Sequence, residues 1–401
     1  MSKKATGGVT MKVVDLRNIF ANCNDQLIEI SDNRIYYAEE KNEEGHNSLF
    51  LLEYNRITKR ERILANYILD RPAFVPHFFS FPDIIFMVLE DGSSHIELLS
   101  IDKITGEERS AVMLNLVGNF SECAALDENH VILFTEEDET HAELFSEYRR
   151  LTGFARVALL FDLEEESYYY LRDPRICNAS ANDLVTYSLE DDRQLLVLQP
   201  HGDEKEKWNC YRNRRWLGDH VNDHVWLCPL FDFIVSAKSG EKRVPLELIL
   251  SAGTDGLVRY AGMNEEEIYF RVKHFPSNDQ RLCAVNKRTG KRQIVAQLNL
   301  RSNELDGYFS IDTEDGRAYK IVDQGDCFVA TGVLHSNLHA PYSKELGDFI
   351  TCVEDRFIIA KYVLADETDS FEFHSIYDCL TGEQQSYECS CAVRGGTVVL
   401  Y

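Results

Sequence analysis

The chain has 401 residues, of which 44% are hydrophobic, so it can bury a sizeable core and lacks the composition of a disordered protein. It holds 67 acidic and 42 basic residues, a formal net charge of −25, which disfavours general binding to nucleic acid or to anionic membrane surfaces. No stretch reaches the roughly 20 apolar residues of a membrane helix, and residues 1–14 lack the apolar run of a signal peptide. Because the 11 cysteines have no fixed spacing, we expect a cytoplasmic protein with reduced thiols.

Short strands dominate the predicted secondary structure. Each is rich in Ile, Val, Phe, Tyr or Leu and is closed by Asp, Asn, Glu or Gly. In chain order, clear examples are Leu27–Ile30, Arg34–Ala38, Ile84–Leu89, Val131–Phe134, Leu195–Leu198, Ile268–Val272 and Phe357–Val363. Helical periodicity is clear in one segment, Glu139–Leu151, where Leu144, Phe145, Tyr148 and Leu151 share a helix face. Strands this short and closely spaced indicate a sandwich, a barrel or a propeller.

A turn motif recurs along the chain and distinguishes these folds. It consists of a short polar residue, two further residues, and then Thr or Ser followed by Gly in most copies. The polar side chain opens such a turn by accepting backbone N–H groups, and the Gly closes it at positive φ. The clear copies end in Thr105-Gly106, Thr289-Gly290 and Thr381-Gly382, and looser copies end in Thr58-Lys59 and, within Ile234–Glu241, in Ser239-Gly240. We expect the clear copies to join antiparallel strands in three different sheets, each with its Gly at positive φ.

The spacing of these turns sets the number of repeats. About 47 residues separate Thr58 from Thr105, and about 50 separate Ser239 from Thr289. The interval from Thr289 to Thr381 fits two periods with one copy lost, and the interval before Ser239 has room for a hairpin near 164–166 and two insertions. A period of about 40–50 residues is typical of propeller blades. The sequence therefore predicts an all-β fold, one β-propeller over residues 1–401 with about seven four-stranded blades, or alternatively six or eight.

The repeats resemble those of quinoprotein-like and WD40-like β-propellers, whose blades often carry an Asp-x-x-Thr-Gly hairpin between the third and fourth strands. The resemblance implies the fold and identifies no catalytic residue, because the Gly-His and Trp-Asp pairs of WD40 repeats are absent. An open run of blades would expose its edges. The terminal segments Met11–Leu16 and Thr397–Tyr401 are apolar enough to be strands, and we expect one or both to pair where the propeller closes.

Two long insertions, helical or irregular, interrupt the repeat at residues 136–156 and 200–224. Each falls between the predicted second and third strands of a blade. Because strands alternate in direction within a blade, both insertions are expected on the face opposite the Thr-Gly turns. Function in repeat folds tends to collect where insertions collect, so this face is the predicted binding face.

The second insertion has an unusual composition. Trp, Tyr and Arg dominate recognition hot spots. Six such residues lie within nine positions, namely Trp208, Tyr211, Arg212, Arg214, Arg215 and Trp216. We expect them to form a patch that binds a partner. In the alternative interpretation, the aromatic residues pin the loop to its blade and the arginines neutralise nearby carboxylates.

Two His-x-x-x-His pairs, His220 with His224 and His335 with His339, are weak metal candidates. On a helix this spacing places both imidazoles on one face, as a zinc site requires. Neither pair lies in a predicted helix, and neither has a glutamate after its first histidine. We therefore expect no metal and no cofactor.

The sequence favours a non-catalytic role. It contains no phosphate-binding loop, dinucleotide fingerprint or hydrolase elbow. The predicted function is a binding or scaffold propeller that recognises a protein or acidic ligand through one loop-rich face, or that associates with itself. The alternative is a metal-dependent hydrolase or lyase with its site at the mouth of the central channel and with catalytic residues that the sequence does not identify.

Overall fold

The structure, a computed structural model, describes residues 11–17, 26–31, 33–43, 46–69, 75–90, 93–152, 155–199, 224–253, 256–274, 279–298, 306–312, 316–365, 370–394 and 396–401. These residues form two compact units. The first described below is Asn24–Arg259, and the second combines Met1–Cys23 with Tyr260–Tyr401.

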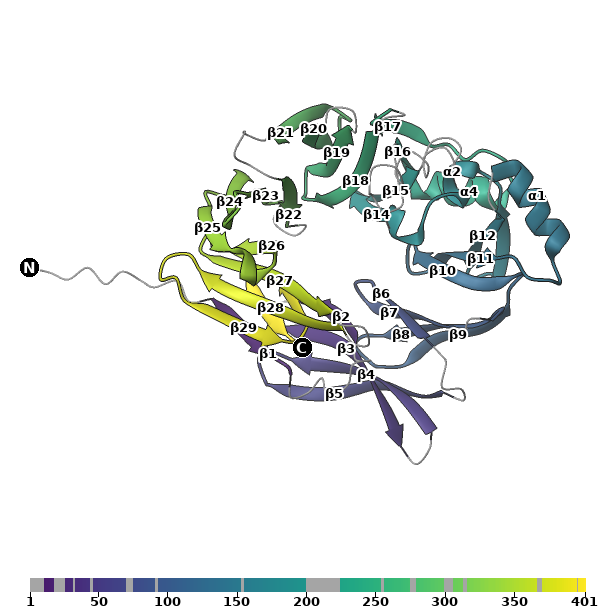
Figure 1. The fold of residues 1–401 in the computed structure, drawn as a ribbon. Coiled ribbons are helices and arrows are strands. Elements are labelled where there is room, and N and C mark those ends of the chain that lie inside the picture. Colours follow the sequence, from purple (N-terminus) through teal and green to yellow (C-terminus); the bar gives the residue numbers. More distant parts are fainter. Residues whose placement is uncertain are drawn as a thin grey trace, which may run out of the picture. The chain divides into compact units, whose positions relative to one another are not determined.

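The fold is an all-β propeller with eight blades in the described part of the chain (Figure 1). Seven blades are four-stranded antiparallel sheets whose strands follow one another in chain order, and one sheet has three strands. The predicted fold, an all-β propeller of about seven four-stranded blades with six or eight as the alternative, is therefore confirmed, and the blade number is eight when the three-stranded sheet is counted.

The unit Asn24–Arg259 holds blades 1 to 4. Blade 1 comprises β2 (Gln26–Ile30), β3 (Arg34–Glu43), β4 (His46–Asn55) and β5 (Arg60–Leu69), and blade 2 comprises β6 (Val75–Ser80), β7 (Ile84–Glu90), β8 (His95–Asp102) and β9 (Glu108–Asn115). Blade 3 comprises β10 (Asn119–Ala125), β11 (His130–Glu136), β12 (Arg156–Asp162) and β13 (Ser167–Leu171), and blade 4 comprises β14 (Leu184–Leu189), β15 (Asp192–Gln199), β16 (His224–Pro229) and β17 (Glu247–Ser251). The described helices of this unit are α1 (Ala142–Thr152), α2 (Pro174–Cys177), the 3-10 turn η1 (Ala181–Asp183) and α4 (Leu230–Lys238).

The second unit holds blades 5 to 7 and the three-stranded sheet. Blade 5 comprises β18 (Gly256–Met263), which starts just before the unit boundary, β19 (Glu267–His274), β20 (Asp279–Asn286) and β21 (Arg292–Leu298). Blade 6 comprises β22 (Gly307–Ile311), β23 (Ala318–Asp323), β24 (Cys327–Leu334) and β25 (His339–Ser343), followed by the 3-10 turn η2 (Lys344–Leu346). Blade 7 comprises β26 (Asp348–Val353), β27 (Phe357–Ala365), β28 (Ser370–Asp378) and β29 (Gln384–Glu388), and the last sheet comprises β30 (Cys391–Arg394), β31 (Thr397–Leu400) and β1 (Lys12–Asp15).

The burial of the strands follows their place in the blade. The second strand of blade 2, β7, is buried at its first six residues, and the third strand of blade 3, β12, is buried at all but its first. The outermost strand β9 alternates between exposed and half-buried residues. Strands covered on both faces form continuous apolar runs, whereas a half-covered strand alternates, which explains why the inner strands were the easier ones to predict.

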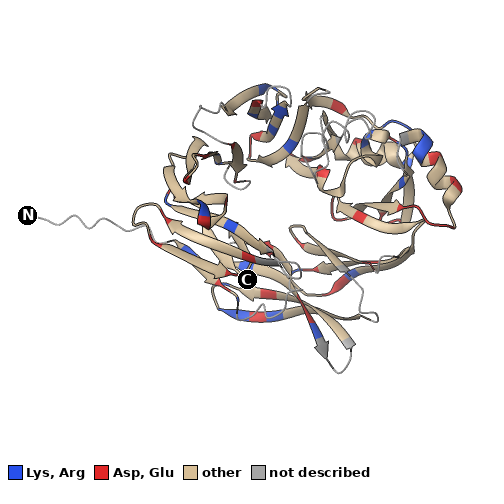
Figure 2. Cartoon of the chain, in the orientation of Figure 1, with Lys and Arg blue, Asp and Glu red and all other residues tan. Residues whose placement is uncertain are grey.

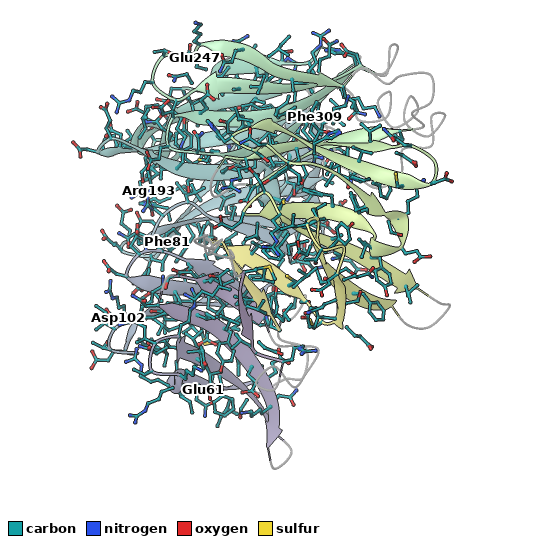
Figure 3. All side chains as sticks on the ribbon, turned by 90° about the vertical axis from the view of Figure 1, so that its left-hand side faces the viewer. Glu61, Phe81, Asp102, Arg193, Glu247 and Phe309 are labelled. Carbon is teal, nitrogen blue, oxygen red and sulfur yellow. The ribbon has the colours of Figure 1, made fainter. Side chains whose placement is uncertain are left out.

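The Thr-Gly turns lie where the repeat predicts them. Gly106, Gly290 and Gly382 have φ of 77°, 63° and 76°, and they join the third strand to the fourth in blades 2, 5 and 7. In blade 2, Oδ1 of Asp102, labelled in Figure 3, accepts the backbone N–H groups of the second and third following residues, each at 2.8 Å. Lys59 occupies the Gly position in blade 1 with φ of 54°. Both the turn chemistry and its repetition are confirmed.

The two copies without a Thr-Gly signature also lie at third-to-fourth connections. In blade 3 the hairpin predicted near residues 164–166 is present, with Glu166 at φ 48°. The lost copy is in blade 6, where His335 at φ 53° lies between β24 and β25.

The copy at Ser239-Gly240 lies at a third-to-fourth connection, as predicted, but the strand predicted before it is wrong. The segment Ile234–Glu241 was expected to be a strand running into a turn, and the structure instead has α4 over Leu230–Lys238. The buried residues Leu230, Phe233, Ile234 and Ala237 recur at helical spacing, and this periodicity outweighs the strand preference of single β-branched residues. Gly240, with φ of 73°, ends the helix rather than a hairpin.

Both predicted terminal strands exist, and they pair with each other. β1 runs parallel to β31, with Lys12 opposite Thr397 and Asp15 opposite Leu400. β31 in turn pairs antiparallel with β30. The expectation that the two terminal segments pair is therefore confirmed. β31 is the middle strand of the three-stranded sheet and β1 is one of its edges.

The described residues include no helix long and apolar enough to cross a membrane. All nine described cysteines are free thiols, in agreement with the absence of a disulfide pattern in the sequence.

Candidate functional site

The segment predicted as the first insertion contains a helix, α1. Residues 137–155 join β11 to β12, the second and third strands of blade 3, and contain α1. Phe145 and Tyr148 are buried on one side of α1, and the Tyr148 hydroxyl donates a hydrogen bond of 2.7 Å to the Leu171 carbonyl of β13. Leu151, expected on the same face, is 40% exposed. The helix is thus fixed against blade 3 by its central turn.

The solvent side of α1 and the loop before it carry charges of both signs (Figure 2). The Arg149 guanidinium pairs with Glu137 at 2.8 Å, and His141 Nδ1 lies 2.8 Å from Asp138 Oδ2. Arg150 is exposed. This surface is therefore polar and of mixed charge.

The second predicted insertion lies at the matching junction of blade 4. It separates β15 from β16, the second and third strands, and Gln199 pairs with His224 across its base. The predicted patch, Trp208, Tyr211, Arg212, Arg214, Arg215 and Trp216, lies outside the described residues. The structure describes only the strands that flank it, β15 and β16, and the patch stays a prediction.

The third tryptophan, Trp226, lies just after this insertion in a stack of rings. The His224 ring stacks on Trp226 with centroids 6.0 Å apart and planes 15° apart, and the Arg175 guanidinium lies 4.9 Å from the Trp226 ring centroid. Arg175 also donates to the Val244 carbonyl at 2.7 Å and pairs with buried Asp173 at 2.6 Å. Asp173 caps α2, so this stack ties the base of the insertion to the connection between blades 3 and 4.

Three of the four histidines of the two His-x-x-x-His pairs belong to the described residues. His335 lies in an exposed turn, and His339 begins β25, where its Nδ1 lies 3.1 Å from the Thr331 hydroxyl oxygen. His224 belongs to the stack described above, and His220 lies outside the described residues. Among the residues that the structure describes, no group of three or more His, Cys, Asp or Glu side chains could hold a metal ion.

A second polar cluster, which the sequence analysis missed, joins blade 3 to α4. His130 Nδ1 lies 2.8 Å from Asp127 Oδ1, and its Nε2 lies 3.3 Å from Asp162 Oδ2 on β12. The ammonium group of Lys238, at the end of α4, pairs with Asp162 and with Glu165, the latter at 2.9 Å. The side chain of Asp162 is only 4% exposed, so Lys238, together with His130 when its imidazole is protonated, neutralises a buried carboxylate.

The protonation equilibria of the cluster follow from these contacts. Burial lowers the pKa of His130, but the hydrogen bond and charge of Asp127 and the charge of Asp162 outweigh it, and the net pKa is raised. Burial raises the pKa values of Asp127 and Asp162, but hydrogen bonds from His130 and Lys238 respectively, together with backbone N–H groups, leave both lowered. For Lys238, burial is likewise outweighed by its bonds to Asp162 and Glu165, which raise the pKa to about 12.

One member of this cluster, Asp162, can be recognised in the sequence by its position in the repeated turn. Asp162 opens the third-to-fourth turn of blade 3, where Asp102 opens that of blade 2, and its Oδ1 accepts the N–H groups of Glu164 and Glu165 at 2.9 and 3.0 Å. The partners His130 and Lys238 come from other elements, 32 residues before and 76 residues after it, and no local pattern links them.

Comparisons with known proteins give similarity of fold only. No protein-family model and no curated protein matches the chain. An uncharacterized protein from Listeria monocytogenes is similar in structure, with a TM-score of 0.44 and 11% identity over 94% of this chain and 97% of that one. An oligogalacturonate lyase from Vibrio parahaemolyticus has a TM-score of 0.44 and 12% identity over 84% and 85% of the two chains. The β-propeller domain of the Trilobed protease from Pyrococcus furiosus has a TM-score of 0.42 and 11% identity over 90% and 97%.

Proposed function

We propose that this chain is a non-catalytic binding propeller that recognises a protein partner carrying an acidic segment. The binding face is the end of blades 3 and 4 that bears the two insertions. The Asp-x-x-Thr-Gly turns resemble those of quinoprotein-like and WD40-like propellers. This resemblance implies the fold and identifies no catalytic residue.

The observation that carries this proposal is the shared position of the insertions. Both depart from second-to-third strand connections, and the two blades follow each other within one compact unit. Strands alternate in direction within each blade, so both insertions leave at the end opposite the Thr-Gly turns. Two features support a recognition surface here: α1 is held in place by the buried Phe145 and Tyr148, and the sequence of residues 208–216 is rich in Trp and Arg.

The chemistry of residues 208–216 supports an acidic partner. Arginine offers a planar fork that binds carboxylates through two N–H groups, and tryptophan offers a broad contact area with few rotatable bonds. A second copy of this chain also qualifies as a partner, because its net charge is −25. The competing arrangement pairs the same arginines with the carboxylates that precede α1, Glu137, Asp138 and Glu139, within one molecule.

The test uses the full chain and a fluorescent Glu-rich peptide as the probe. We expect the wild-type protein to bind the peptide and the triple variant R212A/R214A/R215A to lose about tenfold or more in affinity, since hot-spot residues contribute about 2 kcal/mol or more each. The control R288A/K291A/R292A removes three exposed cations from the β20–β21 turn and should bind as the wild type does. Sedimentation velocity of the same proteins detects self-association.

Three outcomes would contradict the proposal. In the first, neither peptide binding nor self-association is detected. In the second, both triple variants weaken binding equally. In the third, R212A/R214A/R215A melts several degrees earlier while all binding persists, which would assign the arginines to the intramolecular pairing with the α1 loop.

A further inference from the structure

The hairpin formed by β27 and β28 of blade 7 extends beyond the other two strands of its sheet (Figure 1). Across the sheet, β26 begins opposite Lys361, and β29 ends opposite Phe373. Residues 362–365 of β27 and 370–372 of β28 therefore pair with each other and with no further strand that the structure describes. A two-stranded hairpin is only marginally stable by itself in water, so this extension gains from packing against a partner.

One face of this extension is apolar. Side chains alternate between the two faces along a strand, and residues directly opposite each other share a face. Tyr362 lies opposite Phe373, and their rings stack with centroids 4.8 Å apart and planes 5° apart. Leu364, two residues after Tyr362, lies on the same face and is 55% exposed. These three residues are called the apolar face of the hairpin below.

The corresponding hairpin ends in the same unit are polar. The second-to-third connection of blade 5 is flanked by Lys273, His274, Asp279 and Gln280, and that of blade 6 begins after Asp323. Large apolar side chains that are exposed together mark interaction surfaces in proteins. Among these three described hairpin ends, the one in blade 7 is thus the candidate for a docking surface.

The residues that border the apolar face are acidic. Glu388 on β29 is exposed and lies opposite Phe373, so it shares the face. On the β27 side, the 3-10 turn η2 carries the exposed Glu345. This turn lies close to the apolar face, because a Cβ added at Gly347, directly after η2, would lie 2.6 Å from the Tyr362 Cβ. Carboxylates therefore flank the apolar face at both of its edges.

We propose that the apolar face binds a protein segment whose centre is apolar and whose ends carry lysine or arginine. Leu364 and the stacked rings receive the apolar centre, and Glu345 and Glu388 pair with the flanking cations. Lys361 does not offset these carboxylates, because it lies on the opposite face and pairs with Glu372 at 2.5 Å. A second copy of this chain is disfavoured as the partner, since its net charge is −25. The inference goes beyond the proposed function and does not depend on it, because it concerns another blade and a partner of opposite charge.

The first experiment tests the apolar part in the full chain by fluorescence anisotropy. The probe is the labelled peptide KKGLILGKK, and the control peptide KKGSGSGKK keeps the charges without the apolar centre. We expect the wild type to prefer the probe, and L364S to bind it about tenfold more weakly, because a buried leucine contact is lost. V363S is the matched control, since Val363 is the preceding residue, is 51% exposed and lies on the opposite face. It should bind as the wild type does.

Two results of this experiment would overturn the proposal. One is binding of KKGLILGKK that is absent or no stronger than binding of KKGSGSGKK. The other is an equal loss of affinity in L364S and V363S. If sedimentation velocity shows self-association that L364S abolishes while the probe does not bind, the apolar face belongs to an interface between two copies and the proposal is wrong.

The second experiment tests the charged border. E345Q/E388Q should bind KKGLILGKK about three- to fivefold more weakly at low salt, and this difference should disappear at about 1 M salt. The control E354Q/E383Q changes the net charge equally but removes two exposed carboxylates from the β26–β27 and β28–β29 turns, at the other end of blade 7. All variants should unfold at the same urea concentration as the wild type, because the substituted side chains are exposed. Equal weakening by the two double variants would reduce the effect to the overall charge and contradict the proposed border.

Discussion

Replacing the turn glycines one at a time tests the repeat and its contacts together. Gly106, Gly290 and Gly382 share a positive φ, so an alanine at each costs about 1–2 kcal/mol of backbone strain. Their surroundings differ. A Cβ at Gly106 would lie 2.6 Å from the Leu64 carbonyl oxygen of β5, whereas a Cβ at Gly290 or Gly382 would meet nothing within 4 Å.

The contact at Gly106 involves backbone and cannot be relieved by rotating a side chain. Overpacking of this kind adds about 1–3 kcal/mol. We therefore expect G106A to lose about 2–5 kcal/mol of unfolding free energy, and G290A and G382A to lose about 1–2 kcal/mol each. Lys59 occupies the same turn position with φ of 54°, so the substitution K59G relieves backbone strain. After the entropic cost of the added glycine is subtracted, we expect K59G to raise the unfolding free energy by about 0.5–1 kcal/mol.

The assay is urea unfolding of the four variants, monitored by circular dichroism and tryptophan fluorescence. The urea concentrations at the unfolding midpoints are compared among variants whose unfolding free energies have the same dependence on urea concentration. Equal losses for G106A, G290A and G382A would refute the close approach of blades 1 and 2 at Leu64. A loss in K59G as large as that in G290A would refute the common turn conformation.

Three further perturbations test other parts of the structure by the same assay. Y148F removes the hydrogen bond from α1 to the Leu171 carbonyl and should cost about 1 kcal/mol, whereas L151A, at a position 40% exposed, should cost less than half of that. D173A leaves the half-buried Arg175 without its carboxylate and α2 without its cap, and should cost about 3 kcal/mol; an effect below about 1 kcal/mol would contradict the buried pairing. Because the pKa of Asp162 is lowered in the folded state, its contribution is present above about pH 4 and is lost as pH falls through the folded pKa, so the wild type should lose stability on acidification that D162N does not lose.

The sequence was informative where structure depends on neighbouring residues. Asp102 and Gly106 determine a turn within five positions, and the repetition of that turn at Thr289 and Thr381 predicted the blades. The same local reasoning failed at α4, because Ile234 and Val235 favour a strand when considered alone. The buried helix face that contains Ile234 is recognised only when Leu230 and Ala237 are included.

The polar cluster of blade 3 shows the other limit. Asp162 matches the turn-opening residue of the repeat, but nothing near it in the chain indicates that His130 and Lys238 pair with it. Such partners are brought together by the packing of β11, β12 and α4, which is a property of the fold. The predicted patch around Arg212 rests on its composition and on its place in the chain between β15 and β16, and it lies outside the described residues.

The most direct test of the binding face is hydrogen–deuterium exchange of the full chain with and without the Glu-rich peptide. The proposal predicts slower exchange in residues 200–224 and in α1, and unchanged exchange in the β8–β9 and β20–β21 turns. Protection that appears at those turns instead, or that persists in residues 200–224 of R212A/R214A/R215A, would contradict recognition by the arginines of the inserted segment.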